Sequence, residues 1–190
     1  MKSIAVYCGA NTGNDPQIIE ASKEVARIMA KNDIRLVYGA GGVGLMGVIA
    51  DEMIAHGGKT TGIIPTFLMN YEVHHKGLDE LHVVETMHIR KAMMCDLSEG
   101  FLTLPGGYGT LDEIFEILCW RQLQLHRKPV GFLNVNGFYD HIFAHADHMV
   151  KTGFLRPENR EFMILDSDPQ TLLDKMAAFQ SDSNTMKWIN

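Results

Sequence analysis

The chain has 190 residues, of which 46% are hydrophobic and 21% are charged, with a formal net charge of -6 at pH 7. This length and composition are typical of one globular domain with a sizeable core. The acidic balance, with a sequence pI of about 5.8, argues against a protein that coats nucleic acid but is compatible with one small anionic ligand.

Short apolar runs alternate with amphipathic segments along the whole chain. The apolar runs predict strands at Ser3–Tyr7, Leu36–Tyr38, Thr60–Ile64, Leu81–Glu85, Phe101–Leu104 and Val130–Leu133. The amphipathic segments predict helices at Pro16–Lys31, Leu45–His56, Met87–Glu99, Thr110–Leu123, Tyr139–Thr152 and Pro169–Phe179, the last capped by Asp168. This alternation predicts an α/β fold, a doubly wound parallel sheet of Rossmann-like type. We expect a single domain over residues 1–180, followed by a loosely held polar tail over 181–190.

The cysteines and the apolar segments give expectations about the compartment. Cys8, Cys95 and Cys119 are odd in number, widely separated and set in apolar surroundings. We interpret them as reduced, buried thiols of a cytoplasmic protein, not as a disulfide framework or a zinc site. The N-terminal MKSIAVYCG runs straight into a strand pattern and has too short an apolar run for a secretory signal. No stretch approaches the length of a membrane span, so we expect no membrane partner.

The stretch LPGGYGTLDE, residues 104–113, joins a predicted strand to a predicted helix and has three glycines within four residues. Glycines let the main chain approach an anion, and free N–H groups at a helix N-terminus form a ready phosphate site. The Thr110 hydroxyl adds one more donor. A tight turn without a ligand is the alternative, but ligands of open α/β sheets bind at such strand ends. We therefore predict phosphate binding by Gly106 to Thr110.

Glu113 has two interpretations. Thr110 to Glu113 matches a capping box, in which Thr110 is the N-cap and Glu113 reaches back to its amide. A carboxylate one turn inside a phosphate-binding helix is also placed to face the sugar beside that phosphate. Asp112 and Glu116 are alternatives, since helical spacing turns Asp112 about 100° away and sets Glu116 one turn deeper.

The turn GAGGVG, residues 39–44, fits the G-x-G-x-x-G fingerprint of dinucleotide-binding folds. The fingerprint expects an acid at the next strand end to hold a ribose, whereas that strand ends Gly62-Ile63-Ile64-Pro65-Thr66. This difference weakens the interpretation as an NAD-dependent oxidoreductase. We predict instead a mononucleotide contact or a close helix packing.

Arg90 and Lys91 begin a methionine-rich helix just after a strand end. Cations there neutralise a phosphate or assist a leaving base, or they only coat a solvated helix face, and the spacing leaves both open. His141, His145 and His148 fall near one helix face without a carboxylate–histidine motif. We interpret these histidines as surface residues and predict no metal site.

Together these segments resemble a known family. PGGYGTLDE, residues 105–113, is similar to the PGGxGTxxE signature of the Lonely Guy family, cytokinin riboside 5′-monophosphate phosphoribohydrolases. VYCG, YGAGGVGLMG, MHIRKAMM and KPVGFLNVNGFYD extend the resemblance over nearly the whole chain. Relatives were long labelled lysine decarboxylases, but no pyridoxal-binding lysine is evident. The resemblance implies a cofactor-free hydrolase that splits an adenine-type nucleoside 5′-monophosphate into base and ribose 5-phosphate. It also implies a homodimer with the site near the subunit contact.

The resemblance assigns roles to individual residues, with Arg90 and Glu113 as the catalytic pair. The substrate-binding residues it implies are Glu72, Lys91, Gly106, Gly107, Tyr108, Gly109, Thr110, Gly41, Gly42 and Met46. Ala10-Asn11 stands where many relatives have serines, so Asn11 replaces a phosphate contact or the contact is lost. The alternative is a non-catalytic module that senses a nucleotide. The sequence leaves open whether the ligand is a prenylated adenylate, AMP or another nucleotide.

Overall fold

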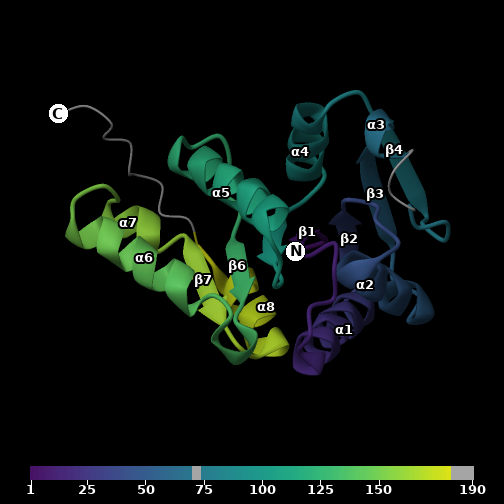
Figure 1. Ribbon diagram of the computed structural model, residues 1–190, viewed down its shortest axis with the longest axis horizontal. Helices are drawn as coiled ribbons and strands as arrows, with labels where there is room; N and C mark the ends of the chain where they lie inside the picture. The colour runs from purple at the N-terminus through teal and green to yellow at the C-terminus, as the bar shows by residue number, and fades with distance from the viewer. Residues whose placement is uncertain (70–73, 181–190) are drawn as a thin grey trace.

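A computed structural model describes residues 1–69 and 74–180 as one parallel sheet covered by helices on both faces (Figure 1). The seven strands lie in the order β4-β3-β2-β1-β5-β6-β7, and every neighbouring pair is parallel. The strands are β1 Ser3–Tyr7, β2 Arg35–Tyr38, β3 Thr60–Pro65, β4 Glu80–Val84, β5 Gly100–Thr103, β6 Val130–Leu133 and β7 Met163–Asp166. The predicted doubly wound α/β fold is therefore confirmed.

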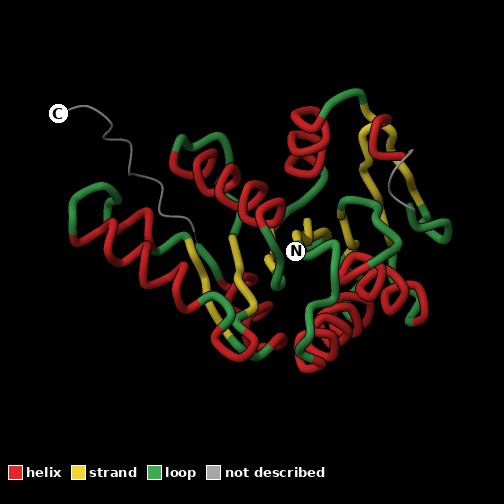
Figure 2. The backbone as a smooth tube through the Cα atoms, in the orientation of Figure 1, coloured by secondary structure: helices red, strands yellow, loops and turns green. Residues whose placement is uncertain are grey.

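The helices form the two outer layers around this sheet (Figure 2). They are α1 Pro16–Lys31, α2 Gly44–Ala55, α3 Thr66–Met69, α4 Met87–Asp96, α5 Tyr108–Gln122, α6 Asp140–Lys151, α7 Pro157–Arg160 and α8 Pro169–Ala178, with a 3₁₀ turn η1 at Val135–Gly137. Apolar side chains of α1, α2 and α8 pack on one face of the sheet. Those of α4, α5 and α6 pack on the other. None of the helices described is long and apolar enough to span a bilayer.

The predicted elements are all present, most with their ends shifted by a residue or two. The segments that the sequence did not predict are short: β7, α3, α7 and η1 have three or four residues each. The predicted cap of α8 is confirmed, since Asp168 Oδ1 accepts from the Thr171 amide at 2.8 Å. The predicted tail at 181–190 lies outside the described residues.

One prediction about the cysteines is wrong. Cys8 and Cys95 are buried, but Cys119 is exposed. On α5, Ile117 and Arg121 are buried toward the interior, and two residues along a helix turn a side chain by about 200°. Cys119 therefore points away from the core, although its sequence neighbours are apolar. His141, His145 and His148 are exposed on α6, as predicted.

The order of the strands reverses between β1 and β5, which lie side by side in register, with Tyr7 beside Thr103. The chain runs outward from β1 through β2, β3 and β4, then returns to β5 on the other side. The turns that follow β1 and β5 consequently diverge to opposite faces and leave a crevice between them. Such a crevice is where open α/β sheets bind their ligands.

Candidate active site

A cavity of about 540 Å³ opens at the carboxyl ends of β1 and β5, at the reversal of strand order. Its lining combines the glycine-rich turns with residues of α4, α5 and the η1 region. The residues that line it are Cys8, Gly9, Ala10, Asn11, Thr12, Gly13, Ile18, Leu45, Met46, Leu68, Met87, Arg90, Pro105, Gly106, Gly107, Gly109, Thr110, Asp112, Glu113 and Phe138. The sequence thus predicted both the edge of the sheet and several of these residues.

Backbone hydrogen bonds hold three turns together beneath the cavity. The Gly9 amide donates to the Pro105 carbonyl at 3.0 Å, and the Gly9 carbonyl accepts from the Leu45 amide at 3.1 Å. A Cβ at Gly9 would lie 2.8 Å from the Asn11 carbonyl oxygen, so the turn is tight there. The floor of the cavity is therefore made of main chain from the segments after β1, β2 and β5.

The N-terminus of α5 opens onto the cavity with its main-chain amides. The helix begins at Tyr108 with Gly107 as the N-cap, and no side chain caps it. The capping-box interpretation of Thr110 to Glu113 is therefore wrong, because Thr110 already lies inside the first turn and Glu113 is deeper. The amides from Gly107 to Thr110 have no acceptor within the helix. A Cβ at Gly107 or Gly109 would meet nothing within 4 Å, so this face is open to an anion.

Thr110 closes the inner side of this turn. Its side chain is buried, and a Cβ at Gly106 would lie 2.1 Å from its Oγ1 atom. A side chain at position 106 would therefore displace the Thr110 hydroxyl from the cavity wall. Gly106 thus allows Thr110 to line the cavity beside the free amides.

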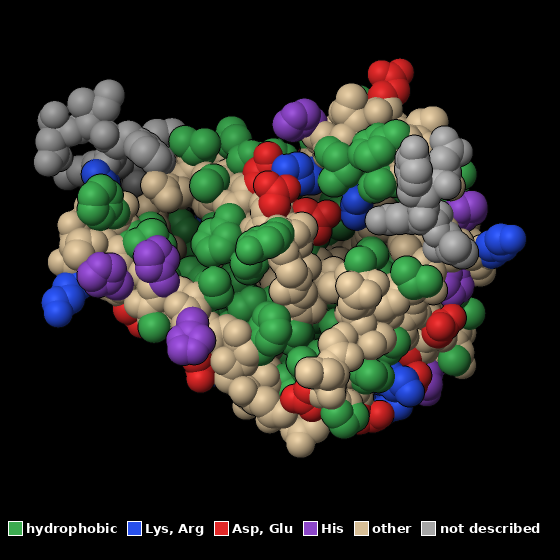
Figure 3. Space-filling model, viewed as in Figure 1, with side chains coloured by type: hydrophobic (Ala, Val, Ile, Leu, Met, Phe, Trp, Pro, Cys, Tyr) green, Lys and Arg blue, Asp and Glu red, His purple; other side chains and the backbone are tan. Residues whose placement is uncertain are grey.

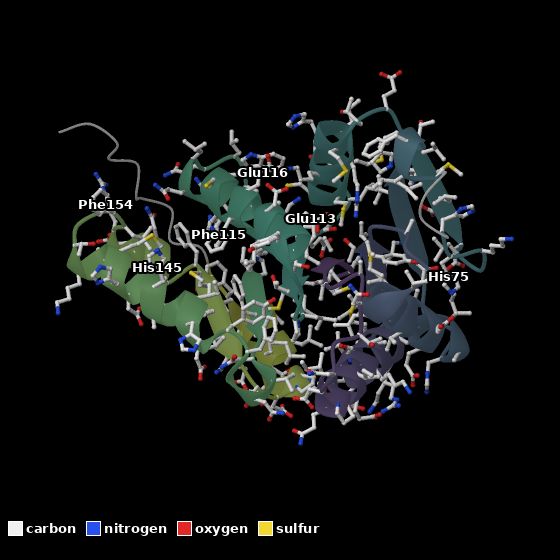
Figure 4. The ribbon with its side chains drawn as sticks, viewed as in Figure 1. His75, Glu113, Phe115, Glu116, His145 and Phe154 are labelled. Carbon is white, nitrogen blue, oxygen red and sulfur yellow. The ribbon has the colours of Figure 1, made fainter. Side chains whose placement is uncertain are left out.

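Arg90 and Glu113 approach each other from α4 and α5 on the wall of the cavity. Arg90 Nη2 lies 3.3 Å from Glu113 Oε1, and the two side chains are only 9% and 11% exposed. Figure 4 shows Glu113 and Glu116 along the side of α5 that faces α4. The Arg90 Nε is buried and has no hydrogen-bond partner among the described residues. A guanidinium and a carboxylate thus meet in a largely dehydrated place beside the helix N-terminus.

Lys91 points to a different part of α5. Its Nζ lies 2.9 Å from Glu116 Oε2 and 3.1 Å from Asp112 Oδ2, and its side chain is 10% exposed. Burial lowers the pKa of Lys91, but the pairs with Glu116 and Asp112 outweigh it and the pKa is raised. Figure 3 shows the acidic and basic side chains gathered where α4 faces α5. Lys91 is not among the residues that line the cavity in the described part of the chain.

The remaining predicted binding residues fall into different surroundings. Met46 lines the cavity, and Gly41 lies behind it, since a Cβ there would be 2.6 Å from the Met46 methyl carbon. Gly42 is partly exposed at the turn before α2. Tyr108 is 93% exposed and points away into solvent. Glu72 lies outside the described residues.

Apart from Met46, the sequence did not single out the apolar part of the lining. Ile18, Leu68, Met87 and Phe138 line the cavity from four different segments, and only the fold brings them together. Leu68, Met87 and Phe138 follow strand ends closely, which was a signal, but apolar residues at such positions are more often core. Cys8 lines the cavity too, and burial, together with the charge of Glu113, raises the pKa of its thiol. This thiol is therefore kept neutral.

The titratable groups beside the pair respond to Glu113. Burial raises the pKa of the Tyr7 hydroxyl, and the charge of Glu113 raises it further. Among the described residues, no cluster of His, Cys, Asp or Glu side chains is arranged to hold a metal ion. The chemistry that the lining offers is that of the buried Glu113 carboxylate, the exposed Asp112 carboxylate, the Arg90 guanidinium and a row of amides.

Known proteins resemble this chain over most of its length. The family model described as "Possible lysine decarboxylase" matches residues 46–176. A cytokinin riboside 5′-monophosphate phosphoribohydrolase of Rhodococcoides fascians is 42% identical, over 88% of this chain and 85% of its own. A probable cytokinin riboside 5′-monophosphate phosphoribohydrolase of Oryza sativa subsp. japonica is 39% identical, over 94% of this chain and 78% of its own.

Solved structures share the fold at much lower sequence identity. The molybdenum cofactor binding protein of Rippkaea orientalis gives a TM-score of 0.70 at 19% identity, over 93% of this chain and 95% of its own. The Moco carrier protein of Chlamydomonas reinhardtii gives 0.69 at 16% identity, over 93% and 97%. These structures support the fold alone. Together with the matched family model and the closely similar relatives, the signature at residues 105–113 shows that this chain belongs to the Lonely Guy family.

Proposed function

We propose that the protein hydrolyses the N-glycosidic bond of an adenine-type nucleoside 5′-monophosphate to free base and ribose 5-phosphate. The observation that carries this proposal is the Arg90–Glu113 pair, at 3.3 Å, on the wall of a cavity that the amides of α5 also face. The names of the relatives, cytokinin riboside 5′-monophosphate phosphoribohydrolases, support the same reaction.

The 5′-phosphate would bind at the N-terminus of α5. The amides from Gly107 to Thr110 have no helical acceptor, and the positive end of the helix dipole favours an anion there. Asn11 and Gly13 also line the cavity, so Asn11 is placed to contribute a side-chain amide to the phosphate. Fixing the phosphate there would hold the sugar in register with Glu113.

Glu113 would act on the sugar. Cleavage of a glycosidic bond builds positive charge on the anomeric carbon, as in an oxocarbenium-like state, and a nearby carboxylate stabilises that charge. The bond from the anomeric carbon to the base nitrogen breaks, and a new bond forms from that carbon to a water oxygen. Glu113 accepts one proton of this water, and the proton ends on the released base.

Arg90 would hold the carboxylate and the developing charges in place. A guanidinium stays protonated in proteins, so Arg90 is not a proton donor to the base. Its planar fork suits two roles, to orient Glu113 in the empty site and to neutralise the phosphate or the departing base when substrate is bound. Either role gives Arg90 a stronger effect on rate than on stability.

The assay that tests this proposal is incubation of the protein with AMP, followed by chromatography for free adenine and ribose 5-phosphate. Turnover by the wild-type protein and its loss in Glu113→Gln supports the proposal. The same assay is run with a prenylated adenosine 5′-monophosphate. If AMP binds but neither nucleotide releases its base, the alternative, a nucleotide-sensing module, is supported. The ratio of the hydrolysis rates for the two nucleotides shows which base is preferred.

We also propose that the protein is a cytoplasmic homodimer. The support for dimerisation is the family membership, together with exposed apolar side chains such as Leu125 and Phe154, which are 70% and 87% exposed. The support for the cytoplasm is that Cys8, Cys95 and Cys119 are all free thiols. Light scattering after gel filtration measures the mass in solution, and a monomeric mass contradicts the dimer.

A further inference from the structure

Gly39 is the first glycine of the G-x-G-x-x-G turn and directly follows β2. It does not have a positive φ, so its backbone conformation is open to other residues. A Cβ at this position would nevertheless lie 1.9 Å from Arg90 Nη2 and 3.0 Å from Arg90 Cζ. Real side chains do not reach such distances. Gly39 is therefore required by the Arg90 guanidinium and not by the chain conformation.

The atom that lies against Gly39 is the same atom that meets Glu113. Arg90 Nη2 is 3.3 Å from Glu113 Oε1, while Nη1 lies 3.7 Å from the sulfur of Met87. The buried Nε has no partner among the described residues. The guanidinium is thus held between the Glu113 carboxylate, the Met87 sulfur and the Gly39 backbone.

The other two glycines of the motif serve different neighbours. A Cβ at Gly41 would lie 2.6 Å from the terminal carbon of Met46, which is the end of a flexible side chain. Gly44 has a φ of 63°, and a Cβ there would lie 2.2 Å from the backbone of Ala10. Each glycine of the G-x-G-x-x-G turn therefore allows a different packing contact within the protein, although the spacing resembles a dinucleotide fingerprint. Only the first of them touches the Arg90–Glu113 pair.

We propose that Gly39 is a positioning residue for the hydrolysis, because it leaves the space in which Arg90 Nη2 meets Glu113. This inference rests on the proposed function, in which that pair acts on the nucleotide. Adding a methyl group at position 39 displaces the guanidinium while leaving both members of the pair present. The substitution is therefore a way to misplace Arg90 without removing it.

A double-mutant cycle tests this with Gly39→Ala, Arg90→Ala and the combined variant. We expect Gly39→Ala alone to lower kcat about tenfold or more, with KM for the nucleotide changed less and no fall in melting temperature. In the Arg90→Ala background the same substitution should change kcat less than about twofold, since no guanidinium remains to be displaced. An equal loss in both backgrounds, or no loss in either, overturns the proposal.

Gly58→Ala is the matched control. Gly58 is not among the residues that line the cavity in the described part of the chain and also lacks a positive φ, and a Cβ there would lie 2.6 Å from the terminal carbon of Met53 and 3.0 Å from the Ala30 Cβ. The control should keep wild-type kcat, whereas a loss equal to that of Gly39→Ala would show that crowding anywhere in this layer reduces the rate.

A crystal structure of Gly39→Ala separates this inference from the proposed function, because it does not depend on turnover. Movement of Arg90 Nη2 away from Glu113 supports the positioning role even if the wild-type protein releases no base from any nucleotide. An unmoved guanidinium overturns it even if the wild-type protein is an active hydrolase.

Discussion

Glu113 and Arg90 come from two different helices and meet with 3.3 Å between Oε1 and Nη2, both nearly buried. The pair places one negative charge beside the cavity without a neighbouring acid of equal burial, since Asp112 is 64% and Glu116 is 26% exposed. Of the three carboxylates that the sequence offered, Glu113 is thus the one that combines burial with a place on the cavity wall. Asp112 and Glu116 pair with Lys91 instead.

Glu113→Gln should abolish turnover and leave the fold intact. The amide keeps the size of the side chain and can still accept a bond from Arg90, but it neither carries charge nor takes a proton from water. We expect the rate to fall by about a hundredfold or more, the scale of a lost electrostatic stabiliser. Rates, nucleotide affinity by calorimetry and melting temperature measure the three effects. Wild-type release of base by the variant contradicts the catalytic role.

Arg90→Ala and Lys91→Ala should differ in kind, although the residues are adjacent. Arg90→Ala is expected to lower the rate by about a hundredfold or more. Lys91→Ala removes the pairs with Asp112 and Glu116 that join α4 to α5, so it should cost on the order of 1 kcal/mol of stability. Urea unfolding and kinetics on both variants check this. A rate loss in Lys91→Ala as large as in Arg90→Ala would indicate that Lys91 contacts the substrate.

Hydrolysis should require the 5′-phosphate. The open amides from Gly107 to Thr110 suit an anion and offer nothing comparable to an uncharged hydroxyl. AMP should therefore be cleaved far faster than adenosine at equal concentration, and inorganic phosphate should compete with AMP. Comparable rates on the nucleotide and the nucleoside would show that the turn is structural.

Gly44→Ala should destabilise the protein more than Gly57→Ala. Both glycines have a positive φ, 63° and 71°, so each substitution adds about 1 kcal/mol of backbone strain. A Cβ at Gly57 meets nothing within 4 Å, whereas one at Gly44 lies 2.2 Å from the Ala10 carbonyl. The difference between the two unfolding free energies therefore measures the clash. Equal losses would mean that the turns after β1 and β2 move apart at no cost in free energy and so relieve the clash.

His126 should make the protein lose stability as the pH falls. Its Nε2 donates to the Ile117 carbonyl at 2.9 Å and its Nδ1 accepts from the Lys128 amide at 3.2 Å, which fixes the neutral ring. Burial lowers its pKa from 6.5 to about 4. Between these pH values the unfolded chain binds a proton that the folded protein excludes. The stability that neutral His126 contributes above pH 6.5 is therefore lost as the pH falls toward 4.

The full pKa shift of His126 lowers the free energy of unfolding at acid pH by about 3 kcal/mol. Unfolding free energies at pH 7 and pH 4.5 should differ more in the wild-type protein than in His126→Gln, whose amide does not titrate. The same pH dependence in both proteins would assign the acid sensitivity to other groups.

The sequence predicted the sheet well because its strands are nearly all apolar and its helices amphipathic. It missed β7, whose four residues MILD lie at the edge of the sheet, with only Met163 buried, and carry little pattern. It misplaced the start of α5, because TLDE imitates a capping box. The backbone, with Gly107 as the cap, starts the helix two residues earlier.

The site was predictable in part for the same physical reason. Glycine turns at strand ends reveal where main chain must approach something, and this located the cavity. What Gly39 approaches is the Arg90 side chain, which comes from a helix far along the chain. A one-dimensional pattern has no means to distinguish that contact from a ligand contact. Likewise, Arg90 and Lys91 are adjacent cations on the same helix. Only the packing of α4 on α5 shows that Arg90 pairs with Glu113 and Lys91 with Asp112 and Glu116.

The Gly9 hydrogen bonds to Pro105 and Leu45 have a consequence for how this enzyme can diversify. The bonds of this floor join main-chain atoms, so substitutions in the surrounding walls leave them in place. The walls, by contrast, are side chains such as Met46, Leu68 and Phe138 from separate segments. Base preference can therefore drift, or be redesigned, one wall residue at a time over an unchanged floor.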